Sequence, residues 1–387
     1  MLSGNRTHVR VLHIGKFYPP HKGGMESHLQ QLCRSLRQYV DVTAMVSSEG
    51  SSTSREIDEG VQVLRVGTQA VIWSSPICPG MLAAIRSVPG DIVHFHHPNP
   101  AAALAYFCSR HRGKLIVSYH SDIVRQALLD SISIPLVHRL LGRAHAVVSM
   151  SPNYIETSPI LRCYRERCHV IPHGIEPADF SQADHASVSE IRQRYGSRIV
   201  LAIGRLVYYK GFEFLIRAMA NVEGHLLIVG TGPLRAPLEH TVQTLGIADR
   251  ITFLGEVQDV VPLYHAADLF VLPSIARSEA FGIAQLEAMA CGKPVINTQL
   301  DSGVPYVSLN GITGITVPPS DSQALACAIN TLLDNEALRL RFGEAARRRV
   351  SEEFTVQIMT QRMLSLYQEV LCEGKADTKI GSAVTSA

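Results

Sequence analysis

Two glutamates, Glu279 and Glu287, stand eight positions apart in a stretch with helical patterning. If the helix begins near Phe281, both carboxylates point to the same side, because residues about two turns apart share a helix face. The backbone N–H groups of Phe281, Gly282 and Ile283 would then be unpaired donors at the helix start, which suit a phosphate. Gly282 would let a ligand approach the backbone closely. These residues predict a site where phosphate-binding N–H groups and two carboxylates meet.

A pair of cations, Arg205 and Lys210, follows the predicted strand 199–203 and precedes a predicted helix at 211–220. A lone pair with this spacing would most often be a solvated turn. Here the pair follows the carboxyl end of a strand, where open parallel sheets bind their ligands. Fixed cations at such a place would stabilise negative charge on a ligand.

These residues must be positioned by strands and helices that alternate along the chain, which is the pattern of βαβ units. A first set of predicted strands ends near 171, a polar interlude spans 176–189, and a second set begins at 199. We therefore predict an α/β protein with two Rossmann-like, doubly wound domains that face a central cleft. The predicted domains are 1–178 and 179–354, followed by a helix at 355–372 that crosses back to the first domain and a tail at 373–387.

Composition limits the function classes. The 387 residues are 46% hydrophobic and 18% charged, enough for two sizeable cores. The net charge is +2, which argues against a dedicated nucleic-acid binder, but residues 1–178 hold 18 Lys+Arg and 12 Asp+Glu, a net charge of +6. The first domain is therefore expected to face an anionic partner, either a phosphate or a membrane surface. The first ten residues lack an apolar secretion signal, so a cytoplasmic protein is expected.

With its glutamate pair, the chain resembles the retaining glycosyltransferases of family 4, which have the GT-B fold. Glu279 and Glu287 match the E-x7-E signature, and the segment 204–211, with Arg205 and Lys210, is similar to the basic diphosphate clamp of that family. Segment 170–175 resembles its interdomain hinge. Segment 23–26, with Gly24, resembles the glycine-rich loop after the first strand.

The resemblance implies roles for these residues. Arg205 and Lys210 would stabilise the leaving diphosphate, and Glu287 would hold the ribose hydroxyls. Gly24 and the backbone of Phe281, Gly282 and Ile283 would also contact the donor. Glu279 would hold a hydroxyl of the donor hexose. His120, which follows the predicted strand 115–119, corresponds to the active-site histidine, and Asp122 is a candidate to orient it.

The run His94-Phe95-His96-His97 could suggest metal ligation. No carboxylate or cysteine stands at ligand spacing beside it, so we expect acceptor-site lining or packing at a strand end. The chain also has no D-x-D motif. This absence fits a transferase that needs neither a metal nor another cofactor, in which protein cations and helix dipoles take the role of a divalent ion.

The resemblance extends to bacterial transferases of surface polysaccharide synthesis that use GDP-sugars. It implies transfer of a hexose, with GDP-mannose or a related GDP-sugar as the best choice of donor, to a lipid-linked or polysaccharide acceptor at the inner face of the membrane. Retention would follow from front-face substitution. A UDP-sugar donor, a sugar-nucleotide epimerase of the same fold and a non-catalytic carbohydrate-binding protein stay open as alternatives. A nicotinamide dehydrogenase is disfavoured, because arginine replaces the third glycine in segment 230–235.

Overall fold

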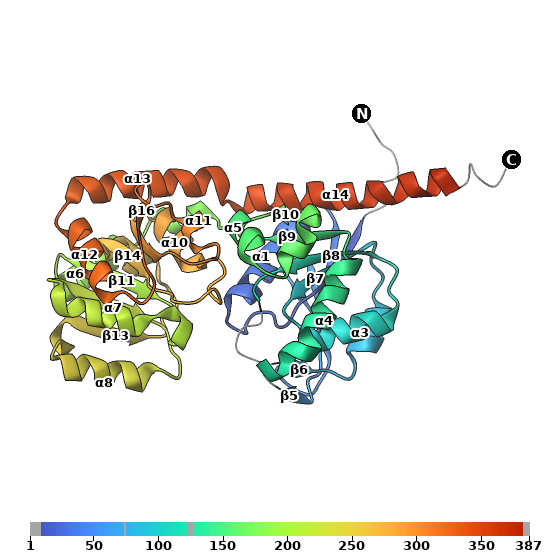
Figure 1. The fold of residues 1–387 in the computed structure, drawn as a ribbon, viewed down its shortest axis with the longest axis horizontal. Helices are drawn as coiled ribbons and strands as arrows, with labels where there is room; N and C mark the ends of the chain where they lie inside the picture. The colour runs from blue at the N-terminus through green and yellow to red at the C-terminus, as the bar shows by residue number, and fades with distance from the viewer. Residues whose placement is uncertain (1–8, 73–74, 123–126, 382–387) are drawn as a thin grey trace. The chain divides into compact units, whose positions relative to one another are not determined.

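The computed structural model describes residues 9–72, 75–122 and 127–381. For residues 127–133 and 373–381 it describes the backbone only. The chain divides into two compact units (Figure 1). Unit 1 comprises residues 1–150, 158–172 and 356–387, and unit 2 comprises 151–157 and 173–355. Residues 151–157 and 173–178, which were predicted to belong to the first domain, lie in unit 2.

Unit 1 is built on an eight-stranded sheet in the order β10-β9-β8-β7-β1-β2-β4-β3. Its pairs are parallel except for β3, which is antiparallel to β4. The strands are β1 (Arg10–Ile14), β2 (Asp41–Ser47), β3 (Ser54–Asp58), β4 (Val61–Val66), β7 (Ile92–His97), β8 (Lys114–Tyr119), β9 (Ala146–Ser149) and β10 (Cys168–Val170). Strand order reverses direction between β1 and β7, which places a ligand-binding crevice at the carboxyl ends of these two strands.

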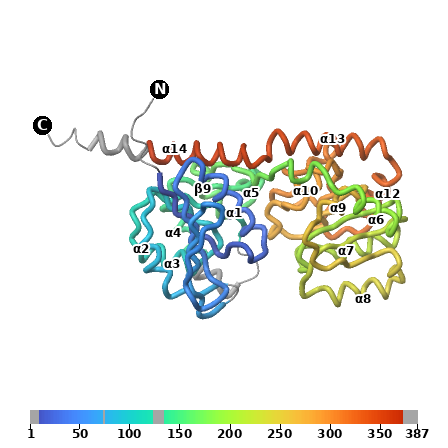
Figure 2. The backbone as a smooth tube through the Cα atoms, turned by 180° about the vertical axis from the view of Figure 1, so that it is seen from behind, coloured from blue at the N-terminus to red at the C-terminus, as the bar shows by residue number. Residues whose placement is uncertain are grey.

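One face of this sheet is covered by α1 (Gly24–Leu36) and α14 (Val356–Gly381), whose apolar side chains share a core with the strands. Figure 2 shows α14 running alongside α1 and β9. Helix α3 (Pro100–Ser109) packs against both α2 (Met81–Ser87) and α4 (Ala127–Arg143). A short hairpin of β5 (Ala70–Ile72) and β6 (Ser75–Ile77) completes unit 1.

Unit 2 has a six-stranded parallel sheet in the order β13-β12-β11-β14-β15-β16. The strands are β11 (Ile199–Ile203), β12 (His225–Val229), β13 (Ile251–Gly255), β14 (Leu269–Leu272), β15 (Val295–Thr298) and β16 (Gly314–Val317). This is the 3-2-1-4-5-6 order of a Rossmann domain, so its switch point lies between β11 and β14. The loops that follow those two strands carry Arg205 and Glu279.

Helices surround the sheet of unit 2. One group, α7 (Phe212–Ala218), α8 (Arg235–Leu245), α12 (Ser322–Leu333) and α13 (Glu336–Glu353), shares an apolar core with the strands. The others are α5 (Pro152–Thr157), α6 (His185–Tyr195), α9 (Val261–Ala266), α10 (Ile283–Ala290) and α11 (Val304–Val307).

Several elements differ from the sequence-based prediction. Helix α6 occupies part of the stretch interpreted as a linker, and it begins where the Asp184 side chain accepts hydrogen bonds from the N–H groups of Ala186 and Ser187. None of its residues is buried, which explains why no apolar pattern marks it. Helix α14 runs to Gly381, past residue 372 where a tail was expected, because no proline interrupts it. No helix within the described part of the chain is long and apolar enough to cross a membrane.

Candidate functional site

The loop after β11 brings Lys210 back to the end of its own strand. Lys210 is the last residue of a short 3-10 turn, and Gly211 follows it with a φ of 67°. A Cβ atom at Gly204 would lie only 3.2 Å from Cε of Lys210. The lysine stem therefore packs directly on the Gly204 backbone, which fixes where its ammonium lies.

The ammonium of Lys210 pairs with Glu279 from the loop after β14, with 2.5 Å between Nζ and Oε2. The Ser274 hydroxyl donates a second hydrogen bond, 3.0 Å long, to the same carboxylate oxygen. Burial lowers the pKa of Lys210, but the carboxylate of Glu279 outweighs that effect and the net pKa is raised. Lys210 therefore stays charged at neutral pH, and the loops predicted from the sequence to act together do meet.

Arg205 differs from Lys210 because its side chain is exposed. It forms no ion pair with any residue that the structure describes. Its positive charge acts on Lys210, where it opposes protonation. Among the described residues, Lys210 pairs with one carboxylate, Glu279, and Arg205 pairs with none, so the two cations leave an excess of positive charge that suits an anionic ligand.

Helix α10 begins at Ile283, two residues later than Phe281, where the sequence analysis placed its start. The cause is Gly282, which has a left-handed conformation with φ of 76° and ends the extended approach to the helix. A Cβ atom there would lie 2.5 Å from Cδ2 of Leu272. Among the described residues, none accepts a hydrogen bond from the backbone N–H of Phe281, Gly282 or Ile283. The three donors are available as predicted, although only the last belongs to the helix.

Glu287 lies about one turn into α10. The Tyr264 hydroxyl donates a hydrogen bond of 2.7 Å to Oε2 of Glu287. Burial raises the pKa of Glu287, while the Tyr264 hydrogen bond and the charge of Lys210 oppose that rise. The charge of Lys210 thus acts on both glutamates of the motif.

The remaining predicted site residues, Gly24 and His120, belong to unit 1. Gly24 is the first residue of α1, in the segment after β1, and it is exposed. His120 directly follows β8, is 4% exposed, and donates its backbone N–H to the His97 carbonyl at 3.1 Å. Asp122, the candidate to orient His120, accepts hydrogen bonds from the hydroxyls of Tyr119 and Ser158.

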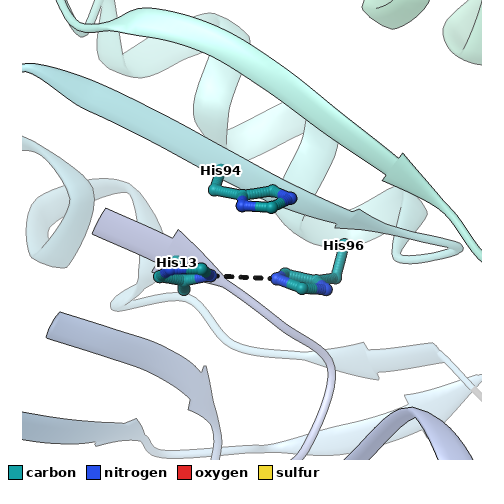
Figure 3. Close-up of side chains that lie close together, drawn as sticks. All are labelled: His13, His94 and His96. Atoms are coloured by element: carbon teal, nitrogen blue, oxygen red, sulfur yellow. Dashed lines mark hydrogen bonds between the residues drawn. The ribbon is translucent and has the colours of Figure 1, made fainter. Parts of the chain in front are cut away.

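His120 ends a series of buried imidazoles. Its Nε2 lies 3.0 Å from Nδ1 of His96. Nε2 of His96 lies 3.1 Å from Nδ1 of His13 (Figure 3). The Tyr367 hydroxyl of α14 lies 3.4 Å from Nε2 of His13 and 2.6 Å from Nδ1 of His94. The series ends where Nε2 of His94 meets the Ser118 hydroxyl at 2.8 Å. We call these six residues, Ser118, His94, Tyr367, His13, His96 and His120, the histidine chain.

The imidazoles of His13, His28, His94 and His96 are neutral. Burial lowers the pKa of His13 to about 3, and that of the neighbouring His28 to about 4. Burial also lowers the pKa values of His94 and His96 far below the ordinary range, and adjacent imidazoles lower them further. Each of these rings therefore carries a single N–H at neutral pH.

The histidine run was expected to line the acceptor site or pack at a strand end, with no metal-binding role. The structure buries the run in β7 and places His94 and His96 in two groups whose nitrogens lie within 4.8 Å of one another: His13, His94 and His96, and His28, His96 and His120. By distance alone these nitrogens could hold a metal ion. Sequence reasoning missed His13, His28, Ser118 and Tyr367. A usable signal was the two-residue spacing of 94 with 96 and of 118 with 120, which puts each pair on one sheet face.

Two family models cover most of the chain. One is described as glycosyl transferases group 1 and matches residues 187–349. The other is described as glycosyltransferase family 4 and matches residues 22–179.

Curated relatives and solved structures agree with these matches. The chain is 33% identical over 369 residues to O-antigen chain mannosyltransferase C of Escherichia coli, which covers 94% of this chain and 99% of that protein. It is 33% identical over 353 residues to D-rhamnosyltransferase WbpZ of Pseudomonas aeruginosa, and the match covers 90% of this chain and 92% of that protein. Anabaena Alr3699/HepE, solved in complex with UDP and glucose, superposes with a TM-score of 0.77 at 21% identity, covering 94% of this chain and all of that one.

Proposed function

Because the chain belongs to the family 4 glycosyltransferases of the GT-B fold, we propose that it transfers a hexose from a GDP-sugar to a lipid-linked or polysaccharide acceptor. Its activity as a glycosyltransferase follows from the family. The donor, the acceptor and the roles of individual residues are the proposal. Neither curated relative above supports the epimerase alternative, since both are named as transferases.

The observation that carries the proposal is the charge arrangement at the switch point of unit 2. Arg205 and Lys210 supply two cations against the single carboxylate of Glu279. The N–H groups of Gly282 and Ile283 add donors that no described residue uses. A nucleotide diphosphate matches this arrangement, because its charge grows as the glycosidic bond breaks and fixed cations and N–H dipoles stabilise that charge.

The sugar and the base are supported by analogy. Mannose and D-rhamnose stand in the names of the two relatives at 33% identity. Guanine, as in GDP, is the base that the resemblance implies, and uracil, as in UDP, is the alternative. We assign Glu287 to the ribose hydroxyls, Glu279 to a hexose hydroxyl, and Gly24 to a donor contact from unit 1.

The proposed reaction is a front-face substitution with retention. The bond from the anomeric carbon to the diphosphate oxygen breaks, and the bond to the acceptor oxygen forms on the same face. The acceptor proton passes to the departing phosphate oxygen, so no protein side chain forms a covalent intermediate. Arg205 and Lys210 stabilise the leaving group, in the role for which other sugar transferases use a divalent ion. We propose that the reaction needs no added metal, and that His120 supports the sugar from unit 1.

The acceptor is proposed to be presented at the inner, anionic face of a membrane. The net charge of +6 in residues 1–178 supports this, because basic surfaces are attracted to anionic lipids.

A donor panel with two arginine variants tests the proposal. Purified protein is given GDP-mannose, GDP-D-rhamnose, UDP-glucose, UDP-galactose and UDP-N-acetylglucosamine, and released nucleotide is measured with and without EDTA. We expect release from a GDP-sugar that EDTA does not reduce, and at least a tenfold loss for Arg205→Ala. Arg217→Ala is the matched control, because Arg217 is also an exposed arginine of unit 2 and pairs with Glu213 on α7. Binding of none of these donors by folded protein would overturn the proposal.

A further inference from the structure

The histidine chain is built from in-line hydrogen bonds. The ring centroids of His13 and His96 are 5.4 Å apart while their facing nitrogens are 3.1 Å apart, and the planes differ by 30°. For His96 and His120 the corresponding values are 5.3 Å, 3.0 Å and 13°. In each pair the difference is about two ring radii, as for rings that meet edge to edge, and Figure 3 shows this arrangement for His13 and His96. Each nitrogen therefore points at the next.

An in-line series of neutral rings has one direction. A neutral imidazole has one donor nitrogen and one acceptor nitrogen. If Nε2 of one ring donates, its Nδ1 must accept, and the same then holds for the next ring. The tautomers of His13, His96 and His120 are thus coupled, and the residue at the end of the series selects between the two possible directions.

Tyr367 contacts the free edge of His13, at the end of this three-ring series, and its distances to His94 and His13 differ. It lies 2.6 Å from Nδ1 of His94, a short distance that suits a hydroxyl donor, and 3.4 Å from Nε2 of His13. Burial raises the pKa of Tyr367 far above 10, so the phenol keeps its proton. Because the Tyr367 hydroxyl donates its hydrogen bond to Nδ1 of His94, the Tyr367 oxygen can only accept a hydrogen bond from His13. Nε2 of His13 must then carry the hydrogen.

We propose that Tyr367 is a positioning residue that, through His13 and His96, holds His120 in the tautomer with hydrogen on Nε2. Nε2 of His120 donates to His96, and Nδ1 of His120 keeps its lone pair. His120 is thereby a hydrogen-bond acceptor at Nδ1, suited to a hydroxyl group rather than to a phosphate oxygen. The inference that this matters for transfer rests on the role proposed for His120 above.

The same geometry favours hydrogen bonds over a bound metal ion between the imidazoles of the histidine chain. A zinc ion needs nitrogen lone pairs that converge from about 2.0 to 2.1 Å. Ring nitrogens that face each other across 3.0 or 3.1 Å leave room for a hydrogen but not for a metal between them. His94 cannot supply a converging ligand without turning, because its ring stacks on that of His96 at 4.7 Å and 18°.

The position of Tyr367 adds a structural consequence. Tyr367 is on α14, far along the chain from the strands that carry the histidines, and it is 1% exposed in the core of unit 1. Helix α14 therefore supplies both apolar packing and the hydroxyl group that sets the direction of the hydrogen bonds along the histidine chain.

The test is a tautomer measurement on full-length protein. Long-range ¹H–¹⁵N correlation spectra of ¹⁵N-histidine protein distinguish a protonated nitrogen from a bare one, and His120→Gln identifies the signals of His120. We expect His120 to carry hydrogen on Nε2 in the wild type and to gain the Nδ1-protonated form in Tyr367→Phe. Tyr106→Phe is the matched control, since Tyr106 is a buried tyrosine of unit 1 that does not belong to the histidine chain.

Kinetics separate this inference from the proposed function. We expect Tyr367→Phe to lower kcat at least about tenfold at an unchanged donor KM, while Tyr106→Phe keeps wild-type kinetics. If His120→Gln leaves transfer unchanged, the role of His120 in the reaction fails although the tautomer result can stand. An unchanged His120 tautomer in folded Tyr367→Phe would overturn the inference. The inference would also be overturned if, after dialysis against zinc, the wild-type protein retained one zinc ion per molecule and the His96→Gln variant retained none.

Discussion

At the scale of single residues, Lys210 serves both the fold and the proposed chemistry. Its ammonium is the partner of a carboxylate that is 8% exposed, so removing it leaves Glu279 charged and buried. Breaking one partner of a buried pair costs about 3 to 5 kcal/mol. We expect Lys210→Met to lower the free energy of unfolding by that amount in urea titrations, and to abolish transfer.

A double variant separates the two roles of Lys210. Lys210→Met combined with Glu279→Gln removes both charges, and we expect it to regain most of the lost stability without regaining transfer. Arg205→Ala should change stability by no more than about 0.5 kcal/mol, because Arg205 is exposed. Equal destabilisation by Arg205→Ala and Lys210→Met would contradict the assignment of only one of them to a buried pair.

Glu287 gives a prediction about pH. Its pKa is raised in the folded protein, so ionisation of this carboxyl disfavours the folded state as pH rises above the ordinary glutamate value of about 4.3. Glu287→Gln keeps an oxygen that can accept from Tyr264 and removes the titration. We expect the variant to be more stable than the wild type at pH 7 and equally stable near pH 3.5, by thermal unfolding. Its affinity for the donor should fall, because a charged acceptor of hydroxyl hydrogen bonds is lost. A wild type that is the more stable of the two at pH 7 would contradict the direction of the pKa shift.

At the scale of elements, α14 is an integral part of unit 1. Met363 is fully buried and shares the core with α1 and the strands. We expect Met363→Ala to lower the free energy of unfolding by about 2 to 5 kcal/mol. Gln361→Ala, on the exposed side of the same helix, is the control and should change it by no more than about 0.5 kcal/mol. Comparable effects of the two substitutions would show that α14 does not pack on unit 1 in solution.

The sequence predicts the elements that carry a strong apolar period. The strand predicted at 199–203 coincides with β11 (Ile199–Ile203), because it is a short, almost wholly buried apolar run. Elements without buried side chains, such as α6 and the exposed strand β3, gave no such pattern. Their existence depends on capping by Asp184 and on pairing of β3 with β4, which single-sequence periodicity does not show.

The site was predictable where it lies in a local motif. Glu279, Gly282 and Glu287 occupy one loop and helix, so spacing alone related them. The partner of Glu279 could be inferred only through the resemblance, and the left-handed Gly282 moved the helix start from the expected place. The histidine chain could not be predicted, because Tyr367 is 273 positions from His94 and only the tertiary fold brings them together.

At the scale of the whole molecule, the charge asymmetry predicts a membrane effect. Residues 1–178 carry a net charge of +6 against a total of +2. We expect the protein to co-sediment with vesicles that contain anionic phosphatidylglycerol, and the bound fraction to fall as salt rises from 0.05 to about 0.5 M, since screening shortens the reach of the charges. Vesicles of neutral phosphatidylcholine are the control, and equal binding to both would contradict an electrostatic contribution.

The central claim is that the loops after β11 and β14 hold the donor diphosphate. The most direct measurement is a crystal structure of the full chain with GDP or UDP, whichever binds more tightly. The account predicts phosphate oxygens within hydrogen-bond distance of Arg205, Lys210 and the N–H groups of Gly282 and Ile283, with the ribose hydroxyls on Glu287. A nucleotide whose phosphates contact none of these groups would contradict it.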